Sequence, residues 1–363
     1  MRAGELWGSS RVVAFETLHP GETLFLRKIF QDTARYKYKN LLEKEPDIIF
    51  LGSSRIMQFR QEMFGPDTTF YNAGGLGDTI LDFQAFWDIL PPDDNLKIIF
   101  VGMDSYNFGQ KRILGEDLKK TLESKEYLSP ANWQPYIYAA RYLALEIIKN
   151  PKRIYEFLNP KDPIGGKIAI GLAALDGDGF RSDGSFQYGS YILARRKDPK
   201  FVDADSNPII SRVRNGTGQF KPDSSFDPER MEILKRFLET ARKRNIFVIG
   251  LALPYSSEVY RELITSPHQK DLFHKFRTEL PEVFREEEFP FFDFSDISVL
   301  GLNDQYMFDG FHPTESAAAV MLKYMLSSSQ LQNTSLFNKK TMVAYLDRQL
   351  RNANTKPFEI EWR

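Results

Sequence analysis

The stretch Asp47-Ile48-Ile49-Phe50-Leu51-Gly52-Ser53-Ser54-Arg55 gives the strongest indication of the fold. A short continuous apolar run of this kind is typical of a strand buried on both faces of a parallel sheet. Two serines and an arginine follow the run directly, so we expect them at the carboxyl end of the strand. Open parallel sheets bind ligands at that edge, and the serine hydroxyls are therefore candidate site residues.

Four further apolar runs resemble buried strands of the same sheet, and they cover residues 69–71, 97–101, 246–251 and 291–294. Helical patterns separate several of the runs, at 22–43, 80–90, 228–243 and 314–327. The clearest pattern is 228–243, because Asp227 can cap it and Pro228 suits its first position. Strands that alternate with helices predict an α/β fold, here a three-layer α/β/α sandwich on a mainly parallel five-stranded sheet.

A long insertion is expected between the third and fourth strands. We expect one α/β domain over 1–330, interrupted by an insertion over 111–227, and a C-terminal tail over 331–363 with a helix at 339–350. Residues 128–158 look helical and aromatic, whereas 163–226 are rich in Gly, Asp, Ser and Arg and are expected to form a long loop. Such a loop either covers the site or is a surface excursion.

Composition excludes several classes of function. The formal net charge is −1, which gives the chain as a whole no long-range attraction to nucleic acid or to an anionic membrane. There is no cysteine, so disulfides, thiol catalysis and zinc-thiolate sites are excluded. No apolar run approaches the ~18 residues that span a bilayer, and the first thirty residues lack the order of a signal peptide. We expect no cofactor and no metal.

The candidate chemistry lies in residues that follow the predicted strands. Asn72–Thr79 follows the second strand, Gly102–Asn107 follows the third, and Asp309 and His312 follow the last. All of these segments are expected at one edge of the sheet. A serine is inert until a base lies within hydrogen-bond reach. His312 can be that base for Ser54, and Asp309 can accept the other ring N–H and fix the tautomer.

These blocks resemble the SGNH/GDSL hydrolase superfamily over roughly residues 44–110 and 245–327. Gly52-Ser53-Ser54 is similar to the Gly-Asp-Ser block of that family, which gives Ser54 the place of the nucleophile. Asp309 and His312 match the Asp-x-x-His block. The resemblance also implies an oxyanion hole made by the backbone N–H groups of Ser54 and Gly77.

The third block departs from the family pattern, because Asp104 stands where an asparagine side chain usually donates to the oxyanion. An ionised carboxylate would repel a developing negative charge, and losing one donor typically costs ~10²–10³ in rate. Asp104 could be protonated or point elsewhere, or Asn107 could take its place. Ser53 and Arg55 are candidate substrate contacts; alternatively, Ser53 caps a helix and Arg55 pairs with an acid on a helix face.

The resemblance implies a serine esterase or O-acyltransferase that acts on a carbohydrate or other cell-envelope ester through an acyl-serine. The Gly-Ser-Ser block is similar to accessory proteins of D-alanylation and polysaccharide O-acetylation. This implies a membrane-bound O-acyltransferase as a partner and a location in the cell envelope, with any targeting segment absent from this chain; a cytoplasmic location is the alternative. The competing hypothesis is a catalytically inactive binding or scaffold subunit, which Asp104 favours.

Overall fold

The computed structural model describes residues 4–65, 68–91, 95–109, 118–124, 133–198, 206–331 and 338–353. The chain divides into two compact units. The smaller unit consists of Met1–Lys44 and Leu118–Lys200, and the larger consists of Glu45–Asp117 and Phe201–Arg363. Residues 111–117, 125–132 and 199–205 of the expected insertion, and 332–337 and 354–363 of the expected tail, lie outside the described residues.

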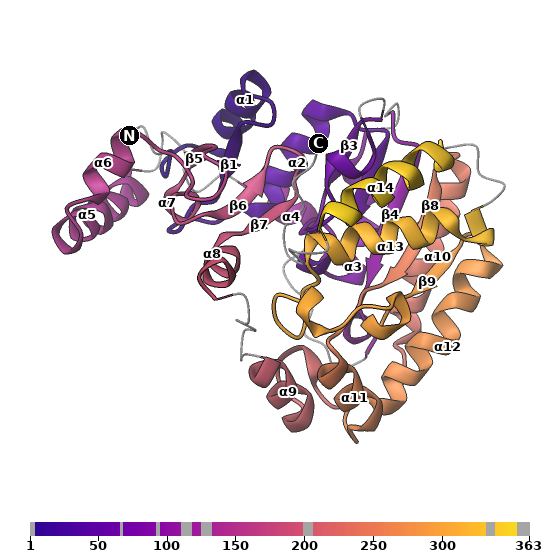
Figure 1. Cartoon of the computed structure of the whole chain (residues 1–363). Coiled ribbons are helices and arrows are strands. Elements are labelled where there is room, and N and C mark those ends of the chain that lie inside the picture. The colour runs from indigo at the N-terminus through magenta and orange to yellow at the C-terminus, as the bar shows by residue number, and fades with distance from the viewer. Residues whose placement is uncertain are drawn as a thin grey trace. The chain divides into compact units, whose positions relative to one another are not determined.

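The larger unit contains a parallel five-stranded sheet (Figure 1), as predicted. Its strands are β2 (Ile48–Leu51), β3 (Phe70–Asn72), β4 (Ile98–Met103), β8 (Phe247–Ala252) and β9 (Phe291–Asp293). The order across the sheet is β3-β2-β4-β8-β9, and every neighbouring pair is parallel. The order reverses between β2 and β4, and ligands bind outside the carboxyl ends of the strands at such a point.

Helices cover both faces of this sheet, which confirms the three-layer prediction. On one face α13 (Glu315–Ser327) and α14 (Lys339–Ala353) complete an apolar core over β2, β4, β8 and β9 (Figure 1). Within this core Phe50 stacks on Phe100 at 4.3 Å between ring centroids. On the other face α3 (Ile80–Ile89) packs against α10 (Pro228–Lys243), where Trp87 stacks on Phe237 at 5.1 Å.

The helix starts follow the capping rules that predicted them. The Asp227 side chain accepts from the N–H of Glu229 at 3.0 Å, and Pro228 is the first residue of α10. Thr314 caps α13 by accepting from the N–H of Ala317 at 3.3 Å. The same unit contains α9 (Ser206–Asn215), α11 (Ser257–Thr265) and α12 (Lys270–Glu286).

The smaller unit is built on a four-stranded sheet of order β5-β1-β6-β7. Its strands are β1 (Thr23–Phe25), β5 (Ile168–Ile170), β6 (Asp178–Arg181) and β7 (Phe186–Tyr188). The described helices of this unit are α1 (Ser9–Leu18), α2 (Thr33–Lys44), α4 (Leu118–Glu123), α5 (Gln134–Lys149), α6 (Arg153–Leu158), α7 (Leu172–Leu175) and α8 (Gly189–Lys197). Here β1 pairs in parallel with β5 and antiparallel with β6.

Two sequence predictions about the stretches that form this sheet and follow it are wrong. The helix expected over 22–43 begins only at Thr33, because Thr23–Phe25 forms a strand between β5 and β6. The stretch 163–226 is not a structureless loop, since it carries three strands and further helices. Its Asp183-Gly184 pair makes the turn of a hairpin in which Phe180 lies opposite Phe186, and an Asp-Gly turn between aromatic residues is a recognised hairpin signal.

The division into units also differs from the expected domains. Residues 1–44 belong with most of the insertion rather than with the parallel sheet, because β1 is a strand of the insertion's own sheet. Residues 201–227 belong to the larger unit. In the part of the chain that the structure describes, no helix has both the length and the apolar character needed to cross a membrane.

Candidate active site

The first block begins where β2 and β4 come closest. A Cβ atom at Gly52 would lie 2.9 Å from the carbonyl oxygen of Gly102 and 3.2 Å from its Cα, so only glycine fits there. The chain then enters a 3-10 turn over Ser54–Ile56, with Ser54 as the first residue. Ser54 is half-buried, which leaves its hydroxyl at the edge where the strand order reverses.

The structure brings the three expected side chains together. Ser54 Oγ lies 2.9 Å from His312 Nε2, although the two residues are 258 positions apart. His312 Nδ1 lies 2.9 Å from Asp309 Oδ2. The carboxylate is an acceptor only, so it assigns the ring proton to Nδ1 and leaves Nε2 to accept from the serine hydroxyl.

Asp309 is held in its ionised form. Its second oxygen, Oδ1, accepts from the backbone N–H groups of Phe311 at 2.8 Å and His312 at 2.6 Å. Burial alone raises the pKa of Asp309, but the hydrogen bonds from His312 and Phe311 and the electrostatic interaction with His312 outweigh burial, and the net pKa lies below the usual value. The carboxylate therefore stays charged at neutral pH and can stabilise an imidazolium.

Backbone contacts fix the loop that carries these two residues. The N–H of Phe308 donates to the carbonyl of His312 at 2.9 Å, and Met307 and Pro313 form an antiparallel bridge. The N–H of Ser256 donates to the carbonyl of Gly310 at 3.1 Å. The base and its carboxylate thus lie in a closed loop, so their positions are set before any substrate arrives.

The segment Asn72–Thr79, which follows β3, is tied to the turn after β2 by Asn72. Its side-chain amide donates to the carbonyls of Ile56 and Phe59, and its oxygen accepts from the N–H of Gly74. The N–H of Gly75 donates to the carbonyl of Gly52 at 2.8 Å. The segment that contains Gly77 is therefore fastened to the turn that contains Ser54.

Gly77 is required for its small size. A Cβ atom there would lie 2.6 Å from a ring carbon of Phe83 and 2.9 Å from the side chain of Leu51. Within the described part of the chain, the backbone N–H groups of Ser54 and Gly77 donate to no protein acceptor. Because N–H groups inside a protein are almost always paired, these two remain candidate donors to a bound group.

The suggestion that Asp104 donates to the oxyanion is wrong in this structure. Its Oδ2 accepts from Ser53 Oγ at 2.8 Å and from the Tyr106 hydroxyl at 2.7 Å, while its Oδ1 is paired with Arg55. Both oxygens are acceptors in a fully buried ion pair. The negative charge is balanced by the guanidinium, so the expected repulsion of an oxyanion loses its basis.

Arg55 and Ser53 are likewise not the substrate contacts that the sequence suggested. Arg55 is 1% exposed, and its Nε donates to the carbonyl of Phe311 at 3.0 Å. Its Nη2 donates to the carbonyls of Leu253 and Pro254 at 2.8 and 2.6 Å. Ser53 is buried and spends its hydroxyl on Asp104. Both side chains therefore hold neighbouring segments of the candidate site in place through buried hydrogen bonds.

The function of Asn107 stays a prediction. It is buried in the 3-10 turn Ser105–Asn107 that follows β4, and its carbonyl accepts from Arg230 at 3.1 Å. The sequence reasoning assigned no function to Asn72 or Tyr106, both of which position the site. The sequence shows that Asn72 and Tyr106 are polar residues at or just after the end of a buried strand. It does not show which groups their side chains will contact.

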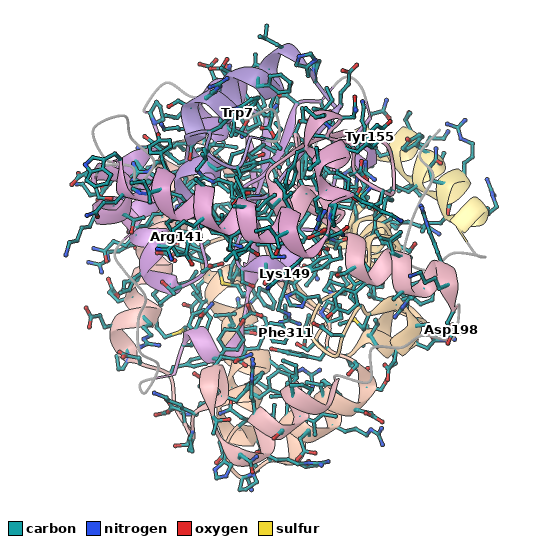
Figure 2. The ribbon with its side chains drawn as sticks, turned by 90° about the vertical axis from the view of Figure 1, so that its left-hand side faces the viewer. Trp7, Arg141, Lys149, Tyr155, Asp198 and Phe311 are labelled. Atoms are coloured by element: carbon teal, nitrogen blue, oxygen red, sulfur yellow. The ribbon has the colours of Figure 1, made fainter. Side chains whose placement is uncertain are left out.

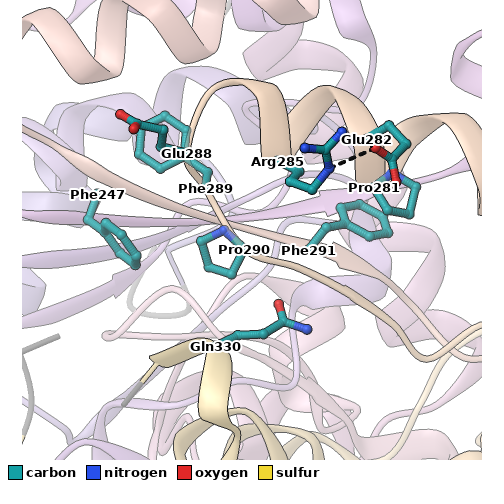
Figure 3. Close-up of a pocket in the computed structure, with 9 residues that line it drawn as sticks. All are labelled: Phe247, Pro281, Glu282, Arg285, Glu288, Phe289, Pro290, Phe291 and Gln330. Carbon is teal, nitrogen blue, oxygen red and sulfur yellow. Dashed lines mark hydrogen bonds and ion pairs between the residues drawn. The ribbon is translucent and has the colours of Figure 1, made fainter. Parts of the chain in front are cut away.

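A separate hollow of about 570 Å³ lies at the opposite edge of the sheet. Its lining includes the first residues of β8 and β9, Phe247 and Phe291, which mark the amino ends of the strands. Figure 3 shows apolar rings with one ion pair, in which Arg285 Nε donates to Glu282 at 2.7 Å. Ser54, Asp309 and His312 follow the carboxyl ends of strands, so this hollow is no part of the candidate active site.

The fold and the site together define an α/β protein with a serine, a histidine and an aspartate in hydrogen-bond contact at the switch point of a parallel sheet. No protein-family model and no curated protein matches the chain.

Proposed function

We propose that this protein is an SGNH-type serine esterase or O-acyltransferase that works through an acyl-Ser54 intermediate. The observation that carries the proposal is the pair of 2.9 Å contacts that link Ser54 to His312 and His312 to Asp309. Such a relay is the arrangement that activates a serine hydroxyl towards an ester carbonyl.

The reaction follows from the positions of the protons. Ser54 Oγ attacks the ester carbonyl while its proton passes to His312 Nε2, and the imidazolium is stabilised by ionised Asp309. The C–O bond to the alcohol then breaks, and Nε2 returns the proton to the leaving alcohol oxygen. In the second half, Nε2 takes a proton from water or from an acceptor hydroxyl, whose oxygen attacks the acyl-serine. The bond between the acyl carbon and Ser54 Oγ then breaks, and Nε2 returns the proton to Oγ.

Negative charge on the carbonyl oxygen would be stabilised by the N–H groups of Ser54 and Gly77. Removing one such donor typically costs ~10²–10³ in rate. The neutral pairing of Asp104 with Arg55 supports the proposal, because it removes a carboxylate charge that would otherwise oppose the reaction. Asn107 remains a candidate for a third donor.

The substrate class rests on the resemblance of the sequence blocks. We propose an acylated carbohydrate or another cell-envelope ester as substrate, with a membrane-bound O-acyltransferase as partner and a location in the cell envelope. The contacts of Ser54, His312 and Asp309 can serve either a water molecule or a sugar hydroxyl as the acceptor in the second step.

A fluorophosphonate probe and a small acetyl ester test the reaction. We expect the probe to label the protein at Ser54, and we expect a burst of released alcohol from the ester. Ser54→Ala should abolish both signals, whereas Ser224→Ala, which removes an exposed serine of the same unit, should change neither. Labelling and turnover that persist in Ser54→Ala would show that another residue is the nucleophile.

The same experiment separates the proposal from the inactive scaffold. That alternative rested on Asp104, whose carboxylate is engaged with Arg55, Ser53 and Tyr106 and therefore no longer favours it. A folded protein that neither labels nor releases alcohol would restore the scaffold hypothesis.

A further inference from the structure

The smaller unit contains a pair of helices with one side packed against the core of the unit and the other side exposed to solvent. The pair consists of α5 (Gln134–Lys149) and α6 (Arg153–Leu158). Its inner side contributes Leu143, Tyr142 and Phe157 to the core of the unit, against Leu24 and Leu172. This packing fixes which sides of the two helices face outward.

The outward side is unusually apolar. Of the twelve exposed large apolar side chains in the described chain, eight lie within residues 133–158. On and beside α5 these are Trp133, Ile137, Tyr138, Leu145 and Ile148, and on α6 they are Ile154, Tyr155 and Leu158. Ile148 is 74% exposed and Tyr155 is 72% exposed. A concentration of this kind marks an interaction surface, because isolated exposed apolar residues are ordinary but clusters are not.

The exposed charges on the same helices have one sign. Arg141, Lys149 and Lys152 are exposed, and Figure 2 labels Arg141 and Lys149 on α5. The acids of these helices, Glu146 and Glu156, are only partly exposed, and Glu156 is paired with Arg153 at 2.6 Å. The whole chain has 48 basic and 49 acidic residues, so an exclusively basic set of exposed charges is a local feature.

We propose that this outward side of α5 and α6, the α5–α6 face, binds the surface of an anionic lipid bilayer with both helices lying in the plane of the interface. Aliphatic side chains with Trp and Tyr suit the boundary between headgroups and acyl chains, and Lys and Arg suit anionic headgroups. A protein partner of matching chemistry would need acidic groups around an apolar groove that receives these side chains.

Vesicle co-sedimentation of the full chain tests the proposal. We expect binding to vesicles of equal parts phosphatidylglycerol and phosphatidylcholine, much weaker binding to pure phosphatidylcholine, and a loss of binding as salt rises. Ile148→Gln should weaken binding about tenfold, because it removes one inserted aliphatic side chain. Lys149→Gln should weaken binding to the anionic vesicles about fivefold.

Matched variants elsewhere in the same unit serve as controls. Leu18 is 77% exposed and lies outside the α5–α6 face, so Leu18→Gln should bind as the wild type does. Lys120→Gln removes an exposed lysine of α4 and should also be neutral. Because Ile148 and Lys149 are exposed, their replacement should leave the thermal unfolding of the protein unchanged.

A measurement on the wild type avoids reliance on variants. Brominated phosphatidylglycerol should quench part of the tryptophan fluorescence, and Trp133→Phe should remove that part. Three results would overturn the proposal: no binding to either vesicle, equal loss of binding in Leu18→Gln and Ile148→Gln, or a concentration-dependent dimer that Ile148→Gln dissolves. The last result would assign the face to a second copy of the chain.

Discussion

Replacing Asp104 by asparagine is the most direct test of how the site is built. The substitution keeps the shape of the side chain and removes the negative charge beside Arg55, which is 1% exposed. Three backbone carbonyls still accept from the guanidinium, but none of them carries a full charge. Removing one partner of a buried ion pair typically costs ~3–5 kcal/mol. We expect the free energy of unfolding to fall by ~3 kcal/mol, at the low end because the carbonyls remain.

Urea unfolding followed by circular dichroism measures this change, and turnover of a small acetyl ester measures its effect on catalysis. We expect kcat to fall and KM to change little, because Arg55 also holds the carbonyl of Phe311, the residue before His312. Asp347→Asn is the matched control. It breaks the exposed pair of Asp347 with Lys323 between α14 and α13, which should cost only ~0–1 kcal/mol.

The outcome can refute the reasoning in two ways. If Asp104→Asn costs no more stability than Asp347→Asn and leaves kcat unchanged, then the charge of Arg55 is not balanced by Asp104. If the substitution instead raises kcat, then the carboxylate of Asp104 opposes the oxyanion in the working enzyme, and the buried pair does not neutralise it.

Three further predictions concern other parts of the chain. Asp309→Asn should lower kcat by ~10³–10⁴. Folding lowers the pKa of Asp309, so this carboxylate stabilises the fold at pH values above the usual carboxyl pKa. Urea titrations should show that this contribution is lost as pH falls through the pKa of the folded state. Gly77→Ala should destabilise by ~1–3 kcal/mol and lower kcat, since Phe83 must move. Burial raises the pKa of Glu16 to about 7, so the free energy of unfolding should decline as pH rises from 4.5, the usual pKa of a glutamate, to about 7, and Glu16→Gln should remove that slope.

The sequence predicted the parallel sheet well because each of its strands is buried on both faces. Ile48–Leu51 is a continuous apolar run, and a run of this kind carries its own signal without a partner. The sheet of the smaller unit gave no comparable signal. Its β1 is only Thr23–Phe25, and its neighbours β5 and β6 lie more than 140 residues further along the chain.

Some residues of the candidate site could be predicted from the sequence and others could not, for a similar physical reason. Ser54, Asp309 and His312 could be found because each follows a predicted strand end, and strand ends of a parallel sheet meet at one edge. The sequence offered an acid as one alternative partner of Arg55 but could not identify Asp104, and it could not show the other partners of Arg55, which are the backbone carbonyls of Leu253, Pro254 and Phe311. Any residue can offer a carbonyl, so no pattern of side chains indicates where a buried guanidinium will be satisfied.

The energetics of the buried Arg55–Asp104 pair indicate what the pair contributes to the protein. A buried ion pair adds little net stability, because desolvation of both charges offsets their attraction. Arg55 follows the candidate nucleophile directly, and its planar fork reaches the carbonyl before His312 and the carboxylate after β4 at the same time. A lysine has no such fork, so Arg55→Lys should keep the charge yet loosen the loop of His312. We therefore expect this variant to lower kcat far more than its modest loss of stability would explain, whereas Lys97→Arg, on an exposed pair, should change neither.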